Sequence, residues 1–440
     1  MAGTEYDKLC DFENLYRAFR LAARGKRGKG DIITFELDLA GNLWSLAEEL
    51  KNGTYRLSGY YHFKVHDPKT RDIQALYFRD RVVQHNLCDN ILRPYFENRL
   101  IHDCAACRRG KGTQFAVERL TAFLRAFYKE HGTNGYILKC DVRKYFDNID
   151  HVILKGLLKD FPDERVRTLL FDIIDSHNRE TGKGLPLGNQ SSQWFALYYL
   201  DRIDRLIKEK YRIRYYTRYM DDLVLVHEDK DYLQQCRKEI ERVAWEERRL
   251  TFNEKTQVFP LTQGVDYVGW HFYVTGTGKV IKRLRTSNKR RFKRRLKAFQ
   301  KQYRAGGKTF EEIKQSLASY NGHLKHGHTW KLRKNLYGKF VLTHTTRGDK
   351  MKTVREVRYS REARSFIKKA EPKLKETIRE AIDSLKTIPA TGDIKPLEGY
   401  KDGRLRLRMG KYRIIFRYDE NDALLILLII NIGSRGDVYK

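Results

Sequence analysis

The chain has 440 residues, a formal net charge of +32 and a sequence pI near 9.8. This length allows two or three domains, and so large a positive charge indicates a polyanionic partner. No stretch of about 18 apolar residues could span a bilayer, and no N-terminal apolar run resembles a signal peptide. The composition therefore argues against a membrane protein and predicts a cytoplasmic one.

The N-terminal part of the chain contains two predicted elements. Residues 1–60 combine mixed charge with apolar residues at helical spacing, which predicts a helical extension. Its expected packing anchors are Trp44, Leu46, Leu50 and Tyr55. The following segment, Tyr60 to Gln84, has the pattern of an antiparallel hairpin rich in basic residues.

The six cysteines are scattered, and only Cys104 and Cys107 have the spacing of metal ligands. No second pair of Cys or His completes a set of four, so a zinc site is the weaker interpretation. Residues 107–112 (Cys-Arg-Arg-Gly-Lys-Gly) are instead expected to continue a basic loop that contacts a nucleic-acid backbone.

Two acidic segments carry the strongest signal. Tyr136–Val142 is an apolar run that contains Asp141 at its end, and Tyr215–Val226 has the pattern of strand, tight turn and strand, with Asp221 and Asp222 at the tip. Adjacent carboxylates repel each other unless cations lie between them. The three carboxylates could bridge two Mg²⁺ ions about 3.5–4 Å apart, which drives nucleotidyl transfer. An isolated Asp-Asp pair is also a common surface turn.

Five ordered motifs make this chain similar to reverse transcriptases. They are Asp141 followed by Tyr145-Phe146, Gly188-Asn189-Gln190-Ser191-Ser192-Gln193, Tyr219-Met220-Asp221-Asp222, Thr251-Phe252-Asn253-Glu254-Lys255-Thr256 and Tyr267-Val268-Gly269-Trp270. The resemblance covers roughly residues 55–345. It implies a right-hand polymerase with fingers, a palm built on an antiparallel sheet, and a helical thumb. Its expected partners are an RNA template, a DNA or RNA primer and deoxynucleoside triphosphates.

The same resemblance assigns the catalytic residues. Asp141, Asp221 and Asp222, with the backbone of Val142, would hold two Mg²⁺ ions, for which Mn²⁺ is an alternative. Lys255 would donate charge or a proton to the leaving pyrophosphate. An inert palm that only binds nucleic acid is the competing interpretation, but it gives no reason for three carboxylates at one place.

The resemblance also assigns the nucleotide contacts to Lys69, Arg71, Phe146, Gly188 and Gln193. Phe146 would be the steric gate that clashes with a 2′-hydroxyl group. Tyr145 is expected in the core, because alternation along a strand would point it the other way. For Lys69 and Arg71 a solvated basic turn remains the alternative.

The segment around Gly188 bears on the type of reverse transcriptase. Many relatives have Gln-Gly here and end in Ser-Pro, whereas this chain has Leu187-Gly188 and ends in Ser192-Gln193. That variant resembles the error-prone enzymes of diversity-generating retroelements. Retron, group II intron and phage-defence enzymes remain alternatives.

The C-terminal part of the chain is basic and then changes character. Lys282–Lys297 contains ten Lys or Arg in sixteen residues, which predicts the start of a thumb that follows template and primer. A polar linker at 346–354 precedes a new domain. Two helices are expected there, the second starting at Pro372, followed by strands at Arg404–Met409, Tyr412–Tyr418 and Ala423–Ile432.

Residues 355–440 resemble the RelE/ParE toxin superfamily. The residues behind this are Lys395-Pro396-Leu397-Glu398-Gly399, Arg404-Leu405-Arg406-Leu407-Arg408, Lys411-Tyr412-Arg413 and Gly433-Ser434-Arg435-Gly436-Asp437-Val438-Tyr439. RelE-like members cut messenger RNA on the ribosome, and ParE-like members bind gyrase. The resemblance implies an antitoxin as a further partner.

The RelE-type roles fall on five residues. Arg404 and Arg406 would bind the RNA backbone, Arg413 would stabilise the phosphorane, Arg435 would protonate the leaving group and Tyr439 would act on the 2′-hydroxyl. The arginine cluster favours a ribonuclease over a gyrase poison, and an inactive RNA-binding domain is a third alternative.

The expected fold is therefore α+β. It has an N-terminal helical extension (1–60), fingers and palm (61–280), a basic helical thumb (281–345), a linker (346–354) and a small RelE/ParE-like α+β domain (355–440).

Overall fold

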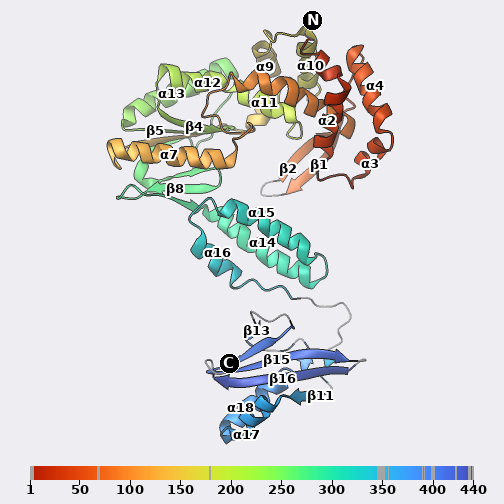
Figure 1. The fold of residues 1–440 in the computed structure, drawn as a ribbon. Helices are drawn as coiled ribbons and strands as arrows, with labels where there is room; N and C mark the ends of the chain where they lie inside the picture. Colours follow the sequence, from red (N-terminus) through yellow and green to blue (C-terminus); the bar gives the residue numbers. More distant parts are fainter. Residues whose placement is uncertain are drawn as a thin grey trace. The chain divides into compact units, whose positions relative to one another are not determined.

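The computed structural model describes residues 4–66, 70–177, 180–343, 352–354, 356–388, 390, 392–397, 402–421, 424–434 and 438. The chain divides into two compact units, each with its own hydrophobic core (Figure 1). The first unit comprises Met1–Arg294 and Ser316–Lys339, and the second comprises Arg295–Gln315 and Phe340–Lys440. In the described parts of the chain, no helix combines the length and apolarity needed to cross a membrane.

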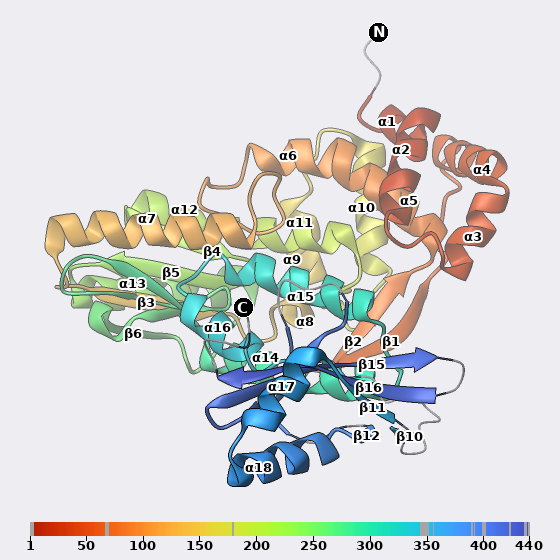
Figure 2. The same cartoon turned by 60° about the horizontal axis from the view of Figure 1, so that its bottom comes forward.

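The N-terminal extension is helical, as predicted, and packs around a later helix, α5 (Figure 2). Its helices are α1 (Asp7–Cys10), α2 (Phe12–Ala23), α3 (Gly30–Leu37) and α4 (Leu39–Lys51). Leu46, Leu50 and Tyr55 are buried as expected, but Trp44 is 63 % exposed, so its predicted anchoring role is wrong. The buried stripe of α4 runs through Leu43, Leu46, Ala47 and Leu50, and Trp44 lies off that stripe.

The predicted hairpin is confirmed over Tyr60–Leu76, but its expected end at Gln84 was wrong because Phe78–Leu87 is a helix. Strands β1 (Tyr60–His66) and β2 (Thr70–Leu76) pair antiparallel, with Tyr60 opposite Leu76. Only the base of the hairpin is buried, and its far end is exposed. The chain then enters α5 (Phe78–Leu87), a π-helical turn at Cys88–Leu92 and α6 (Arg93–Glu97).

A four-stranded antiparallel sheet of order β4-β5-β3-β6 forms the centre of the first unit. Its strands are β3 (Tyr136–Asp141), β4 (Tyr215–Tyr219), β5 (Asp222–His227) and β6 (Gln257–Pro260). Both acidic segments are therefore strands, as predicted. Alternate side chains enter different cores: Leu138 and Leu225 join one, and Ile137 and Val224 join the other.

The helices around these strands in the sequence are α7 (Thr113–His131), α8 (Tyr145–Asn148), α9 (His151–Leu157), α10 (Glu164–Asp175), α11 (Gln190–Tyr199), α12 (Asp201–Arg205) and α13 (Lys230–Arg248), with a π-helical turn at Leu206–Lys210. Of these, α7 and α13 make extensive contacts with the sheet. Figure 1 shows α7 running alongside the sheet, and side chains of α7 belong to the same core as Ile137 and Val224.

A second, three-stranded sheet precedes the basic helices. It consists of β7 (Val265–Tyr267), β8 (Trp270–Val274) and β9 (Val280–Leu284), and the helices are α14 (Thr286–Arg304), α15 (Phe310–Leu324) and α16 (Trp330–Tyr337). The predicted basic helix is confirmed only from Thr286 onward, because Lys282 and Leu284 pair with β8 in β9. A run of basic residues does not distinguish an exposed strand from an exposed helix.

From Lys352 onward, the second unit is a small α+β domain with a five-stranded sheet, β11-β16-β15-β14-β13. Its strands are β11 (Glu356–Tyr359), β13 (Ile394–Pro396), β14 (Leu405–Met409), β15 (Tyr412–Asn421) and β16 (Leu424–Ser434), and β10 (Lys352–Thr353) pairs separately with β12 (Thr387–Ile388). Helices α17 (Arg361–Lys369) and α18 (Pro372–Asp383) contact the sheet (Figure 1).

The two predicted helices and three predicted strands of this domain are confirmed, with Pro372 in the first turn of α18. The outer strands β11 and β13 were not predicted. They are three or four residues long, and charged residues interrupt them, so neither forms an apolar run.

Candidate active site

The acidic motif lies in the tight turn between β4 and β5. Tyr219 and Asp222 are the last paired residues, which leaves Met220 and Asp221 at the tip. Met220 has φ of 55°, a left-handed conformation that is uncommon for a residue with a side chain. The predicted strand, turn and strand are therefore present, and Asp221 projects from the turn.

Strand pairing brings the first acidic segment to the same place. β3 pairs antiparallel with β5, and Asp141 lies directly opposite Asp222. Burial raises the pKa of Asp221, and the negative charge of Asp141 raises it further. The two carboxylates of Asp141 and Asp221 are thus close enough to repel each other, which is the condition that a bound cation would relieve.

The carboxylate of Asp222 is paired with a positively charged side chain of the same chain. It forms an ion pair with Lys139, which lies two residues before Asp141 on β3. Burial lowers the pKa of Lys139 to about 7, while the Asp141 carboxylate acts in the opposite direction. In the described residues no three His, Cys, Asp or Glu side chains are grouped as ligands of one metal ion. Lys139 therefore pairs with Asp222, and its charge also acts on Asp141 and Asp221.

Asn253 is a site residue that the motif analysis did not single out. Its side-chain amide donates to Asp141 Oδ2 at 2.7 Å, and its backbone N–H donates to the Asp141 carbonyl at 2.8 Å. The first bond holds the Asp141 carboxylate, and the second holds the backbone of Asp141. Asn253 belongs to the segment from which only Lys255 was selected, and Lys255 itself is exposed. Val142, also predicted at the site, is buried and bridges to Phe252.

The predicted gate and its neighbour lie on a short helix, α8, rather than on a strand. Lys144 takes a left-handed conformation and ends the extended segment, so the strand alternation expected for Tyr145 and Phe146 was wrong. The burial difference is nevertheless the expected one. Tyr145 is 3 % exposed and donates to the Ala196 carbonyl, whereas Phe146 is only partly buried.

Gly188 lies against the backbone of β2. A Cβ atom added to Gly188 would come within 2.3 Å of the Gln74 carbonyl oxygen, so a side chain there would push the two segments apart. Leu187 beside it is 37 % exposed, and Gln193 lies half-buried on α11. This contact joins the loop to the base of the hairpin.

The basic residues of the fingers are placed differently from one another. Arg71 is exposed on β2 opposite Val65, and Lys69 lies outside the described residues. In the basic loop at 107–112, Arg108 turns inward, where it pairs with Glu97 and donates to the Ile101 carbonyl. The predicted nucleic-acid contact is therefore wrong for Arg108. Its neighbour Arg109 is exposed.

In the second unit, arginines on β14 alternate with core residues, and one group lines a small cavity. The cavity of about 160 Å³ is lined by Asp393, Lys395, Arg406, Arg408 and Arg413. Arg413 is 6 % exposed and donates to the carbonyls of Gly410 and Tyr412, while its Nε has no hydrogen-bond partner among the described residues. Four cations against one carboxylate make this a site for an anion.

Arg404, the other predicted residue of this domain that the structure describes, is not among the residues that line this cavity. Arg404 lines a separate cavity of about 580 Å³, together with Arg358, Arg364 and Arg417. Arg435 and Tyr439 lie outside the described residues. The structure therefore joins Arg406 with Arg413 and separates both from Arg404.

Comparison with known protein families assigns both parts of the chain. Residues 64–272 match the family "Reverse transcriptase (RNA-dependent DNA polymerase)", and residues 357–439 match "ParE toxin of type II toxin-antitoxin system, parDE". The chain carries a reverse transcriptase domain followed by a ParE toxin domain. Its α+β fold is that of a right-hand polymerase with a small α+β domain appended, as expected.

The chain is also similar to the group II intron-encoded protein LtrA of Lactococcus lactis subsp. cremoris. The match has 26 % identity over 175 residues and covers 37 % of this chain and 27 % of LtrA, so it spans about a quarter of that protein's length. The same match is found for LtrA of strain MG1363.

Two solved telomerase structures are similar at a lower level. Telomerase from Candida albicans in complex with a telomeric RNA fragment gives a TM-score of 0.39 at 14 % identity, over 58 % of this chain and 52 % of that one. Apo telomerase from Candida tropicalis gives 0.38 at 13 % identity, over 52 % and 49 %. At these TM-scores the likeness adds nothing to the assignment.

Proposed function

We propose that this protein is an RNA-directed DNA polymerase that extends a primer by two-metal nucleotidyl transfer. The observation that carries the proposal is a placement: β3 pairs with β5 so that Asp141 lies opposite Asp222, beside the β4–β5 turn that carries Asp221, in the part of the chain that matches reverse transcriptases. Neighbouring carboxylates suit divalent cations, which relieve their repulsion.

The residues present fit a magnesium site. Asp141 and Asp221, with the carbonyl of Val142, would hold the ions, and Asn253 would keep the Asp141 carboxylate in one orientation. Bound Mg²⁺, or Mn²⁺ in its place, would lower the pKa of the primer 3′-hydroxyl and neutralise the triphosphate. Asp222, paired with Lys139, would balance charge beside the ions.

The remaining residues of the proposed site handle the nucleotide. Phe146 would exclude a 2′-hydroxyl, and Arg71 with Lys69 would contact the triphosphate. Lys255, which is exposed, could reach the leaving pyrophosphate after a side-chain movement. Gly188 would let its loop approach β2 closely, and this loop would pack beside the templating base.

Two types of retroelement enzyme are candidates for this domain. The Leu187-Gly188 variant favours an error-prone enzyme of the diversity-generating type, because an apolar residue replaces a polar one beside the templating base. The similarity to LtrA favours a group II intron-type enzyme instead. Misincorporation opposite template adenine that is no higher than opposite the other bases would exclude the first type.

Primer extension on an RNA template tests the polymerase proposal directly. We expect the purified full chain to add deoxynucleotides in the presence of Mg²⁺, and the double variant Asp221→Ala plus Asp222→Ala to add none. Asp231→Asn, an exposed carboxylate on α13, serves as the control and should retain full activity. Equal extension by the parent and the double variant would trace the activity to a contaminant. Absence of extension by both would favour the alternative of an inert palm.

For the C-terminal domain, a second activity is favoured by the cationic cavity. A group of Lys395, Arg406, Arg408 and Arg413, of which Arg413 is buried, lines a space of about 160 Å³ and suits a phosphate of RNA, as an mRNA interferase of RelE type would need on the ribosome. Gyrase binding, to which ParE-like toxins are adapted, requires no such cavity. An antitoxin is the expected partner in either case.

Growth arrest tests this second activity. The full chain carrying Asp221→Ala, which silences the polymerase, should still arrest growth when expressed, and adding Arg413→Ala should relieve the arrest because the cavity loses its buried cation. Arg361→Ala, an exposed arginine on α17, is the matched control and should leave the arrest intact. Arrest that persists with Arg413→Ala, together with intact messenger RNA, would favour gyrase as the target.

A further inference from the structure

The residue immediately before the acidic turn region is a buried arginine. Arg218 lies on β4, is 0 % exposed, and forms an ion pair with Asp204 of α12, which is also 0 % exposed. A buried ion pair is a weak source of stability, and apolar residues of similar volume often serve a core as well or better. The pair therefore needs an explanation other than packing.

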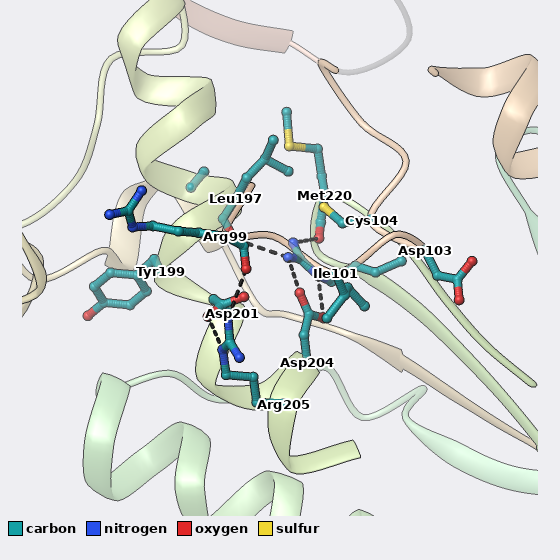
Figure 3. Close-up of polar contacts among 12 residues, drawn as sticks. Arg99, Ile101, Asp103, Cys104, Leu197, Tyr199, Asp201, Asp204, Arg205 and Met220 are labelled. Atoms are coloured by element: carbon teal, nitrogen blue, oxygen red, sulfur yellow. Dashed lines mark hydrogen bonds and ion pairs between the residues drawn. The ribbon is translucent and has the colours of Figure 1, made fainter. Parts of the chain in front are cut away.

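The Arg218 guanidinium donates four hydrogen bonds, and one of them is to the turn. Nε and Nη2 both donate to the Asp204 carboxylate, Nη2 also donates to the Leu197 carbonyl at 3.0 Å, and Nη1 donates to the Met220 carbonyl at 2.9 Å. Figure 3 shows the carbonyls of Leu197 and Met220 and the carboxylate of Asp204 gathered at this point.

Asp204 is held as firmly as its partner. The Tyr216 hydroxyl donates to Asp204 Oδ1, so the carboxylate accepts bonds from two side chains of β4. Burial alone would lower the pKa of Arg218, but the Asp204 carboxylate outweighs this effect and raises the pKa well above its ordinary value. The charge of Arg218 is consequently permanent.

The Met220 carbonyl is the half of the Met220–Asp221 peptide that Arg218 fixes. Met220 is in the left-handed region, which is uncommon for a residue with a side chain and persists only where the surrounding contacts hold it. Because the same peptide carries the Asp221 N–H, its orientation decides where the Asp221 side chain begins. The backbone of Arg218 is anchored as well: its N–H donates to the Asp103 carbonyl, and its own carbonyl accepts from the Ala105 N–H.

We propose that the Asp204–Arg218 pair is a positioning device for the Asp221 carboxylate. It selects one orientation of the Met220–Asp221 peptide and so sets the direction from which Asp221 meets a divalent cation, without touching substrate itself. This inference rests on the proposed metal site, and metal binding measured without turnover separates its failure from that of the polymerase proposal.

The test compares two ion pairs that each include an aspartate of α12, namely Arg218–Asp204 and Arg205–Asp201. The full chain carrying Arg218→Met should bind Mn²⁺ about 10–100-fold more weakly by titration calorimetry, as is typical when the support of a metal ligand is removed. Primer extension should show a similar fall in kcat, with the KM for deoxynucleotide little changed. Arg205→Met is the matched control: Arg205 pairs with Asp201 on α12, and its other bonds go to Glu209 and the Arg99 carbonyl (Figure 3).

A second variant covers the case in which Arg218→Met does not fold. Asp204→Asn keeps the shape and an acceptor for Tyr216 but removes the charge that holds the guanidinium, so it should weaken Mn²⁺ binding in the same direction by a smaller factor. Arg218→Lys should not rescue, because one ammonium group cannot reproduce the fork that spans Asp204 and Met220.

Several outcomes would overturn the proposal. They are unchanged Mn²⁺ affinity in a folded Arg218 or Asp204 variant, an equal loss with Arg205→Met, and loss of the folded state in both the Arg218→Met and the Asp204→Asn proteins, which would show that the pair serves the fold. A parent protein that binds Mn²⁺ more tightly than Arg218→Met but extends no primer would leave the positioning role standing and remove the polymerase proposal.

Discussion

Replacing Asp221 by Asn should lower the rate of primer extension by about 1,000-fold, and Asp141→Asn should do the same. Metal ions at a reacting phosphoryl group supply several kcal/mol of stabilisation, and each 1.36 kcal/mol corresponds to a factor of ten. Asp141 lies opposite Asp222, beside the turn that carries Asp221, and both carboxylates are proposed ligands of the ions. The measurement is single-nucleotide extension at saturating primer–template and Mg²⁺.

Asp222→Asn should be clearly milder, with a loss of about 10-fold, because its carboxylate is paired with Lys139 and acts beside the ions rather than on them. This ranking distinguishes the geometry of this protein from a site in which three carboxylates share the metals. A loss with Asp222→Asn as large as with Asp221→Asn would mean that Asp222 leaves Lys139 and becomes a ligand when metal binds.

Replacing Phe146 by Ala should reduce discrimination against ribonucleotides by about 100-fold, because a specific clash is removed while the rest of the pocket remains. Phe146 is only partly buried at the start of α8, four and five residues after Val142 and Asp141, so its ring is available to an incoming sugar. The ratio of kcat/KM for deoxynucleotide to that for the matching ribonucleotide is the quantity to measure.

Tyr145→Phe is the matched control for the gate. Tyr145 is buried, and its hydroxyl donates to the Ala196 carbonyl. Losing that bond should lower the free energy of unfolding by about 1 kcal/mol and leave the sugar preference unchanged. If Tyr145→Phe relaxed the preference and Phe146→Ala did not, the two aromatic residues would have exchanged roles.

Much of the architecture was predictable, because the signals are local. The apolar run that ends at Asp141 and the two apolar runs on either side of the Asp221–Asp222 turn predict strands from local composition, and the structure has strands there. Pro372 marked the start of α18 because proline suits the first turn of a helix. Trp44 was misplaced because an apolar residue type does not say which face of a helix it occupies. The start of α14 was misplaced because a run of basic residues does not distinguish a strand from a helix.

The sequence by itself determined the order of the elements and led to the proposal that three acidic residues share one site. Only the tertiary structure decided how those residues are used. Lys139 forms an ion pair with Asp222 because β3 and β5 pair in this register. Asn253 donates a hydrogen bond to Asp141 from a loop 112 residues further along the chain. Arg218 forms an ion pair with Asp204 because the fold brings α12 and β4 together. These are contacts between distant segments, and no periodicity in a chain encodes which distant partner a buried charge will find.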